Sequence, residues 1–295
     1  MEEALNRILP GIGGEPVIDR LVALSGSDFT SLMLEVARRR AASQTPASVL
    51  RRYAHDRFVR PGGASARALR RTEDVLLGRL GAQTELLTLA PLVPLGTHSA
   101  LGTVSQNKVV SALRTCEVAA DPTNALALEA AVRRTSGTTE TVRLAAIQRV
   151  VRAQPVPAGY AAHFSLFGLV TAGRDTGSLR FEIAALAEQI RFAIDALTAA
   201  GVPEVQIALT PLSQQGERIA AAITGVDVDR GRTSGRGYYQ EVCFKVNAVM
   251  DDEVTEIGDG GFTDWTAKLT GNKKERLLIS GYGLERLSAI VEERR

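Results

Sequence analysis

The amino-acid sequence predicts an α+β fold in which an antiparallel sheet is flanked by helices. The 295 residues are 45% hydrophobic and 23% charged, a composition typical of a globular protein with a sizeable core. Apolar residues recur at helical spacing in some segments and form alternating or continuous strand-like runs in others. Helices intermix with several hairpin-connected strands, which favours an antiparallel sheet over a doubly wound parallel one.

The bulk composition excludes several classes of function. The 35 basic and 33 acidic residues give a formal net charge of +2, so nothing points to the concentrated basic surface that nucleic-acid binding needs. Cys116 and Cys243 are too few for a disulfide framework or a zinc cluster, and the three histidines lack metal-ligand spacing. We therefore expect no metal and no cofactor, and a reducing cytoplasm is the simplest compartment. No signal peptide and no apolar run near the roughly 20 residues of a membrane span is found.

The first 62 residues are expected to form a polar, helical N-terminal extension, and residues 63–295 a single compact unit. A helix should cover residues 27–43, with Ser27 or Asp28 as its cap. Residues 51–63 are basic with interleaved aromatic residues, which fits either a phosphate-binding arm or an exposed helix end. We favour the helix end, because short basic stretches are often misleading.

The remaining elements follow in irregular order. Helices are expected at residues 65–80, 125–135, 140–154, 181–201, 214–226 and 284–295. Strands are expected at residues 84–96, 108–120, 159–173, 202–212, 238–249 and 275–283. Pro91 and Pro94 should mark a strand end or an edge, because proline cannot donate to a sheet ladder. Residues 258–269 are expected to form a glycine turn that opens a helix.

Motifs of other chemistries are absent from the sequence: it has no G-x-S-x-G elbow, no Walker loop and no H-E-x-x-H pair. Residues 231–237, "GRTSGRG", fit either an anion cradle of backbone amides or a flexible hairpin connection. Both interpretations stay open.

Three segments near the C-terminus stand in an order found in one known family. They read "GRGYYQEVCF", "GDGGFTDW" and "GYGLERL". Together they resemble the histidyl-tRNA synthetase catalytic core, a class II synthetase fold with a six-stranded antiparallel sheet. The resemblance places Tyr238 and Tyr239 in the amino-acid pocket.

The same resemblance assigns further residues. Gly260, Gly261 and Asp264 match the glycine-rich turn beside the amino-acid pocket, and Arg286 matches the ATP-binding arginine of the last class II signature. Upstream, Thr123 matches a pocket loop in "ADPTNALALEAAVR". The order of segments covers residues 65–295, so we expect a catalytic core without an anticodon-binding domain.

Departures from the family pattern concern the cations that hold ATP. We place the second signature, "F-R-x-E", a loop, then "R-x-F", at residues 163–181, where the strand has no arginine. Arg174, Arg180 and Arg236 are the remaining candidates for phosphate contacts, each from a shifted position. One fixed cation aimed at transition-state charge contributes about 3 kcal/mol by analogy with oxyanion-hole donors. The losses favour a protein without catalysis of its own.

Two of the retained features have a simpler structural explanation. Strand alternation would place one of Tyr238 and Tyr239 in the core and the other at the surface. Arg286 could equally pair with Glu285 or Asp264. We favour a pocket for the tyrosines and leave Arg286 open between the two.

A synthetase-like core without an anticodon-binding domain resembles the regulatory subunit of ATP phosphoribosyltransferase. That resemblance implies assembly with a short-form catalytic subunit in the first step of histidine biosynthesis, with histidine as an effector. It also implies a homodimer, paired through residues 65–94, within a hetero-oligomer. The alternatives are an adenylate-forming ligase with a rearranged phosphate clamp and a binding scaffold without a ligand.

Overall fold

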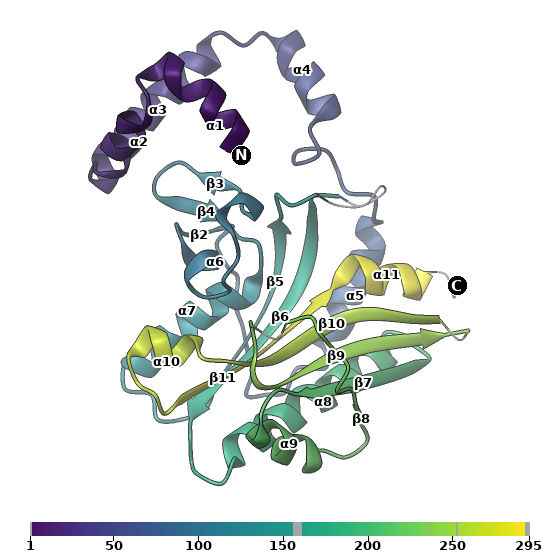
Figure 1. Ribbon diagram of the computed structural model, residues 1–295. Coiled ribbons are helices and arrows are strands. Elements are labelled where there is room, and N and C mark those ends of the chain that lie inside the picture. Colours follow the sequence, from purple (N-terminus) through teal and green to yellow (C-terminus); the bar gives the residue numbers. More distant parts are fainter. Residues whose placement is uncertain (1, 156–160, 236, 252, 293–295) are drawn as a thin grey trace.

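The computed structural model describes residues 2–155, 161–235, 237–251 and 253–292, and it has the predicted α+β fold. Its centre is an eight-stranded sheet of order β1-β5-β6-β11-β10-β9-β7-β8 (Figure 1). All neighbours in this sheet are antiparallel except the two outermost pairs, β1 with β5 and β7 with β8. The strands are β1 (Glu85–Leu86), β5 (Val142–Val151), β6 (His163–Arg174), β7 (Glu204–Pro211), β8 (Asp227–Val228), β9 (Gln240–Met250), β10 (Glu253–Thr263) and β11 (Glu275–Gly283).

Helices cover both faces of this sheet, as Figure 1 shows. Four helices pack on the first face: α5 (Ala66–Leu77), α8 (Arg180–Ala199), α9 (Gln214–Ala221) and α11 (Leu284–Glu292). The second face is only partly covered, by α7 (Pro122–Thr135) and α10 (Trp265–Thr270). The uncovered part of the second face, over β7, β9 and β10, is where the candidate site lies.

Alternation along the central strands divides the core into two layers. On β6, Phe167 and Leu169 pack into the layer under α8, while Val170 and Ala172 pack into the layer under α7. This is the period-two pattern of a strand that is buried on both faces.

A small second sheet stands at the N-terminal side of α7. It has the order β2-β4-β3, with β2 (Leu92–Pro94), β3 (Ser111–Ala112) and β4 (Cys116–Val118). It is accompanied by the short helices α6 (Thr97–Ala100) and η2 (Gln106–Lys108). The two segments expected as single strands, 84–96 and 108–120, are thus each divided. Prolines interrupt the first, and Arg114 and Thr115 turn the second with positive φ.

The helix predicted at residues 140–154 is wrong, because this segment forms β5. It pairs with β6 over ten residues, from Val142 opposite Ala172 to Val151 opposite His163. Nearly all of its residues are buried or half-buried, since both faces of the sheet are covered at this position. A strand buried on both faces has no polar alternation, so its sequence does not distinguish it from a buried helix.

Residues 2–55 form an arm that rises over the sheets as an arch (Figure 1). Its elements are α1 (Glu2–Ile8), η1 (Leu9–Ile12), α2 (Glu15–Val22), α3 (Gly26–Ala42) and α4 (Pro46–His55). The cap of α3 is Ser25, whose hydroxyl accepts the Asp28 backbone N–H, two residues before the predicted cap. Leu9 is the only described residue of the arm that is fully buried. In the described part of the chain, no helix has the length and apolar character to cross a membrane.

Candidate functional site

The site is built around two adjacent aromatic rings that precede β9. Tyr238 and Tyr239 lie in the turn before the strand, so strand alternation does not separate them. Their rings meet edge to face, with centroids 4.8 Å apart, and Tyr238 also meets Trp265 at 5.4 Å. Tyr239 is buried and Tyr238 is half-buried. The pair therefore forms one wall on the second face of the sheet.

Tyr239 is held by a carboxylate and a guanidinium group. Its hydroxyl donates to Asp259 Oδ2 at 3.2 Å, and Arg232 Nη2 donates to the same oxygen at 3.1 Å. The guanidinium carbon of Arg232 also lies 5.9 Å from the centre of the Tyr239 ring. Arg232 has only 4% of its side-chain surface exposed, whereas Asp259 keeps 40%, so the carboxylate faces the open side of the group.

These surroundings change the ionisation of the three side chains of the wall. Burial raises the pKa of both tyrosines well above the usual range, and the negative charges of Asp259 and Asp121 act in the same direction. Enclosure by protein atoms also raises the pKa of Asp259, and it outweighs the opposing effect of Arg232. The carboxylate is thus recessed in the protein yet reachable by solvent, which is the position of a ligand-binding group.

The N-terminus of α7 supplies the opposite wall. Asp121 caps the helix, and its Oδ1 accepts from the backbone N–H of Thr123 at 2.9 Å and from the Thr123 hydroxyl at 2.7 Å. Arg152 follows β5 and brings Nη2 to 3.5 Å from Asp121 Oδ2, while its Nε donates to the Ala120 carbonyl at 3.1 Å. Asp121, Thr123 and Arg152 all act on the ionisation of Tyr238, so the two walls are close together.

A buried polar network fixes the N-terminus of α7. The His98 ring is 1% exposed; its Nδ1 lies 2.8 Å from Asn124 Oδ1, and its Nε2 accepts the Ala120 backbone N–H at 3.0 Å. Glu117, with no exposed surface, accepts the backbone N–H groups of Gly96 at 3.1 Å and His98 at 2.9 Å. The small sheet and α7 are thereby joined through hydrogen bonds, which position the wall with Asp121.

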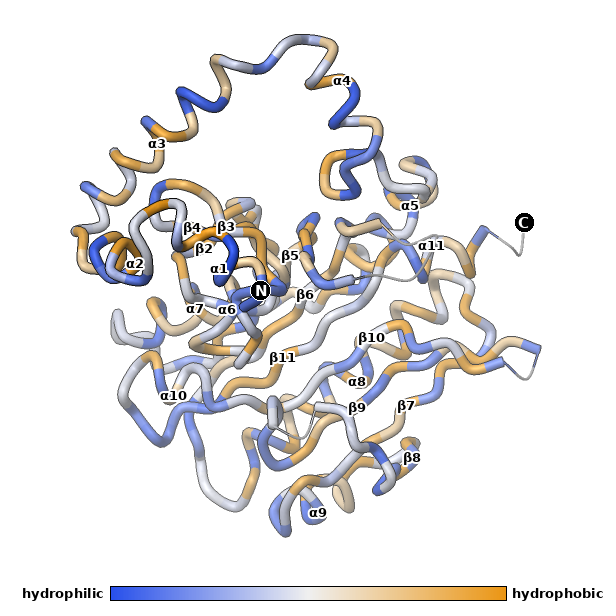
Figure 2. Tube along the Cα trace, turned by 45° about the horizontal axis from the view of Figure 1, so that its top comes forward, coloured by the Kyte–Doolittle hydropathy of each residue, from blue (hydrophilic) through white to orange (hydrophobic). Residues whose placement is uncertain are grey.

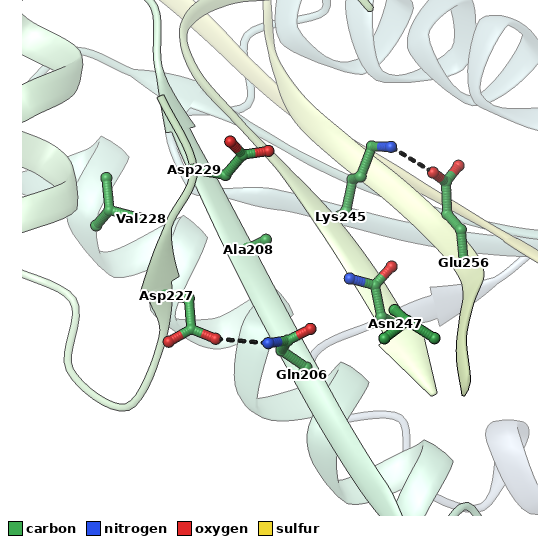
Figure 3. Close-up of a pocket in the computed structure, with 9 residues that line it drawn as sticks. Gln206, Ala208, Asp227, Val228, Asp229, Lys245, Asn247 and Glu256 are labelled. Carbon is green, nitrogen blue, oxygen red and sulfur yellow. Dashed lines mark hydrogen bonds and ion pairs between the residues drawn. The ribbon is translucent and has the colours of Figure 1, made fainter. Parts of the chain in front are cut away.

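An open groove of about 710 Å³ continues the site outward across β7, β8, β9 and β10 (Figure 3). Lys245 stands directly across from Asp259 in the strand register, so the groove and the tyrosine wall share one face of the sheet. Its ammonium group is 2.7 Å from Glu256, and Gln206 donates to Asp227 at 2.9 Å. With Asp229, the groove has three carboxylates and one ammonium group.

The structure separates the residues that the resemblance assigned to the amino-acid pocket. Tyr238, Tyr239 and Thr123 lie together, and Gly261 lies under Tyr239, where an added Cβ would be 2.6 Å from the ring. Gly260 faces the other side of the sheet, toward Phe244. Both glycines lie in strand β10 and not in the predicted turn. They are glycines because the Tyr239 ring on one side and the Phe244 ring on the other leave no room for a side chain.

Asp264 lies elsewhere, in a second cavity of about 520 Å³ at the far end of β10. It pairs there with Lys268 at 3.0 Å. Asp264 is the N-cap residue of α10, and it makes no contact with Tyr239, Asp259 or Arg232 among the hydrogen bonds and ion pairs of the described residues.

The predicted phosphate contacts are also dispersed. Arg286 is exposed, and its Nη1 donates to the Glu256 carbonyl at 2.7 Å, at the margin of the groove rather than to Glu285 or Asp264. Arg174 ends β6 opposite Glu275, and Arg180 donates to carbonyls of the loop before α8, both at the end of the sheet away from Arg152. Arg236 lies outside the described residues, so the predicted anion cradle at 231–237 is only partly described.

Comparison with known proteins was made by sequence and by structure. No family model and no curated protein matches the sequence. An ATP phosphoribosyltransferase regulatory subunit/histidyl-tRNA synthetase from Bacillus halodurans is similar in structure, with a TM-score of 0.62 and 14% identity over 79% of this chain and 83% of that one. The fold is that of a class II aminoacyl-tRNA synthetase core.

Other class II cores are also similar. Apo histidyl-tRNA synthetase from S. aureus has a TM-score of 0.60 and 14% identity, over 77% of this chain and 66% of that one. A histidine–tRNA ligase subunit from Alicyclobacillus acidocaldarius has a TM-score of 0.58 and 15% identity, over 80% of this chain and 97% of that one.

Arg152 directly follows β5, which forms a hairpin with β6 next to β11. The placement of the second signature at residues 163–181 stays a prediction. We missed Arg152 because we assigned β5 to a helix.

Arg232 and Asp259 were missed for a different reason. Arg232 lies in a glycine-rich segment that has no periodicity, and its contact with Asp259 joins residues 27 apart in sequence. In the sequence, only the charged Asp259 between two glycines could have indicated that this segment contributes to the site. No group of three or more His, Cys, Asp and Glu residues within the described ranges is arranged to hold a metal ion.

Proposed function

We propose that the pocket binds a free amino acid without activating it, and that the chain acts as a regulatory subunit. In this proposal it assembles with a short-form ATP phosphoribosyltransferase catalytic subunit in the first step of histidine biosynthesis. Histidine is the effector, bound between the tyrosine wall and the N-terminus of α7.

The balance of charge in the pocket is the observation that carries this proposal. Arg152 faces Asp121, and Arg232 faces Asp259, so cations and carboxylates are equal in number. An α-amino acid has one charge of each sign and finds a partner for both: its carboxylate at Arg152 and its ammonium group at Asp259. Charge-assisted hydrogen bonds of this kind are roughly twice as strong as neutral ones.

A nucleotide triphosphate is poorly matched to the same surface. Its phosphates require an excess of cations, which catalysis of phosphoryl or adenylyl transfer also needs to stabilise developing charge. The outer groove instead has three carboxylates against Lys245, and Lys245 is already paired with Glu256. Both guanidinium groups of the pocket face carboxylates as well. The site is therefore suited to recognition of an amino acid rather than to its activation.

The name of the Bacillus halodurans protein, which contains "ATP phosphoribosyltransferase regulatory subunit", supports the partner in this proposal. A pocket regulates a partner when the ligand binds two assembly states with different affinity, and such coupling is typically 1–3 kcal/mol. This corresponds to a change of about 5- to 150-fold in the affinity of the protein for histidine between the two assembly states.

The test uses the full chain with a purified short-form catalytic subunit. The mixture should catalyse phosphoribosyl transfer, and histidine should inhibit it, whereas neither protein alone should respond to histidine. Asp259→Asn should weaken histidine binding, measured by calorimetry, by at least tenfold, because the ammonium group loses its carboxylate. Asp264→Asn is the matched control, since it removes the same charge in the other cavity. No change of the catalytic subunit's activity on mixing would exclude the regulatory role.

A second function remains supported by one observation, the position of Arg152 on the β5–β6 hairpin. An adenylate-forming ligase would need this guanidinium group at the α-phosphate. Pyrophosphate exchange measured with a panel of amino acids distinguishes the two proposals. Robust exchange that is lost in Arg152→Gln would establish the ligase, and binding of histidine without exchange favours the regulatory subunit.

A further inference from the structure

The N-terminal arm exposes an unusual amount of apolar surface. Of the 21 large hydrophobic residues that the described chain exposes, twelve lie in its first 55 residues. They are Leu5, Ile8, Ile12, Ile18, Val22, Leu24, Leu32, Leu34, Val36, Val49, Leu50 and Tyr53. Single exposed apolar residues need no explanation, but a concentration of this kind marks an interaction surface. Figure 2 shows hydrophobic segments repeated along the whole arch.

The spacing of these residues places them in stripes. Ile18 and Val22 are four residues apart on α2, and Leu32 and Val36 are four apart on α3. Val49 precedes Tyr53 by four residues on α4. Residues four apart lie on the same side of a helix, so each of these helices has an apolar face. A helix with such a face is stable in water only when another surface covers it.

Charge is distributed unevenly along the arm. Residues 2–28 have five acidic and two basic side chains, whereas residues 29–55 have one acidic and five basic side chains. Glu15, Asp19, Arg40 and Arg51 are all exposed. The first half of the arm is therefore an acidic amphipathic surface, and the second half is a basic one.

We propose that this arm is an interface between two copies of the chain, paired antiparallel. The acidic half of one arm then lies against the basic half of its partner, and the apolar stripes cover one another. Such an arrangement is the isologous contact of a twofold dimer, in which one surface is its own complement. A nucleic acid or an anionic membrane would attract the basic half and repel the acidic half, and so fits the arm less well.

The base of the arm is connected to the candidate site. Arg57 donates from Nη1 to the Gln154 carbonyl at 2.9 Å and from Nη2 to the Ala153 carbonyl at 2.5 Å. His163 Nε2 lies 2.6 Å from the Arg60 carbonyl. Ala153 and Gln154 directly follow Arg152, so pairing of the arms holds the segment that brings Arg152 to the pocket. This interface is separate from residues 65–94, where the resemblance predicts the dimer contact, and it does not depend on the proposed function.

Charge reversal on the full chain tests the proposal directly. Glu15→Arg with Asp19→Arg gives the acidic half of the arm a net positive charge, and Arg40→Glu with Arg51→Glu removes the net charge of the basic half. None of these four side chains is part of an ion pair or hydrogen bond that the described chain shows. Sedimentation equilibrium should give a wild-type dimer. Each double variant alone should dimerise at least tenfold more weakly, because the attraction between the acidic half of one arm and the basic half of its partner is then lost.

Mixing the two double variants gives the decisive measurement. The two double variants should pair with each other more tightly than either pairs with itself, because the basic half of one then lies against the acidic half of the other. An unfolded or misfolded variant could not do this. Glu204→Arg with Lys274→Glu, on exposed positions of the sheet region, is the control and should dimerise like the wild type. A wild type that is monomeric, double variants that dimerise as tightly as the wild type, or a mixture that stays monomeric would each overturn the proposal.

Discussion

The sheet region buries its large apolar side chains, whereas the arm exposes many of them. On the sheet, Leu144 and Phe167 are fully buried, and side chains from distant segments fill the space between strands and helices. On the arm, Val22 is 78% exposed and Leu50 is 68% exposed, although the same kinds of residue recur at regular helical spacing. Local sequence determines that both regions form helices. Whether the apolar face of a helix is covered depends on what lies opposite, which the local sequence does not specify.

This difference has a consequence for stability. Burial of a large apolar side chain contributes about 1.5–3 kcal/mol relative to its exposure, so the sheet region should dominate the free energy of unfolding. The arm should contribute little until it is paired. Four measurements test this difference between the arm and the sheet region.

The largest effect is expected for Gly260→Ala in β10. The new Cβ would stand 2.5 Å from the Ile279 carbonyl oxygen and from the Phe244 ring, so the neighbouring strands would have to move. We expect a loss of about 3 kcal/mol in the free energy of unfolding, measured by urea denaturation. Gly281→Ala is the control on the adjacent strand, because its Cβ meets no atom within 4 Å. Equal stability of the two variants would contradict the packing described for β10.

Glu117→Gln should have the next largest effect. The carboxylate is fully buried and accepts from Gly96, His98 and Gln106. Burial alone would raise its pKa, but these three hydrogen bonds outweigh that effect, and the pKa is lowered. Replacing an acceptor oxygen by an amide group that faces donors should cost about 2–3 kcal/mol.

The pH dependence of this loss follows from the lowered pKa. The stabilisation by ionised Glu117 is fully present above the unfolded pKa of about 4.3. It is lost as pH falls through the lower folded pKa, so the difference between wild type and Glu117→Gln should shrink there. Glu140→Gln, on an exposed residue, should match the wild type at every pH. A difference that grows on acidification would refute the described network.

A smaller effect is expected on ligand affinity at Asp259. Because the pKa of this carboxyl is raised, it takes up a proton at higher pH than an ordinary aspartate. The neutral form attracts an ammonium group less, so amino-acid affinity should fall on acidification, and the fall should begin at a higher pH than an ordinary aspartate would give. Calorimetric titrations of wild type and Asp259→Asn separate this effect from protonation of the ligand itself. The same pH profile in both proteins would exclude Asp259 from the binding group.

The smallest effect is expected for Leu50→Ala on the arm. Removing a side chain that is 68% exposed should change the free energy of unfolding by less than about 0.5 kcal/mol at protein concentrations that keep the chain monomeric. Leu126→Ala, which empties a fully buried position on α7, should cost about 2–5 kcal/mol. A large effect of Leu50→Ala under these conditions would show that the arm packs on its own sheet region.

Much of the fold was accessible from the sequence. Helix α8 and strands β6, β7 and β11 lie close to their predicted positions, because amphipathic spacing and apolar runs bounded by turns are local signals. The order of three motifs near the C-terminus also predicted the class II fold. Strand β5 was assigned wrongly because burial on both faces removes the alternation that distinguishes a strand.

Only part of the site could be predicted from the sequence, for a related physical reason. Tyr238, Tyr239 and Thr123 belong to recognisable motifs, and the structure brings them together. Arg152 became a candidate only when the β5–β6 hairpin was known, and Arg232 only through its contact with Asp259.

The sequence by itself determined the kind of most elements, though not of β5 and β10, and it determined the synthetase-like order of motifs and the amphipathic character of the arm. These properties depend on side chains within a few residues of one another. The tertiary structure decided which strand carries Arg152, which carboxylate faces each guanidinium group, and which apolar faces stay uncovered. Those relations join residues far apart in the chain, and they arise only when strand pairing has brought the segments to one face of the sheet.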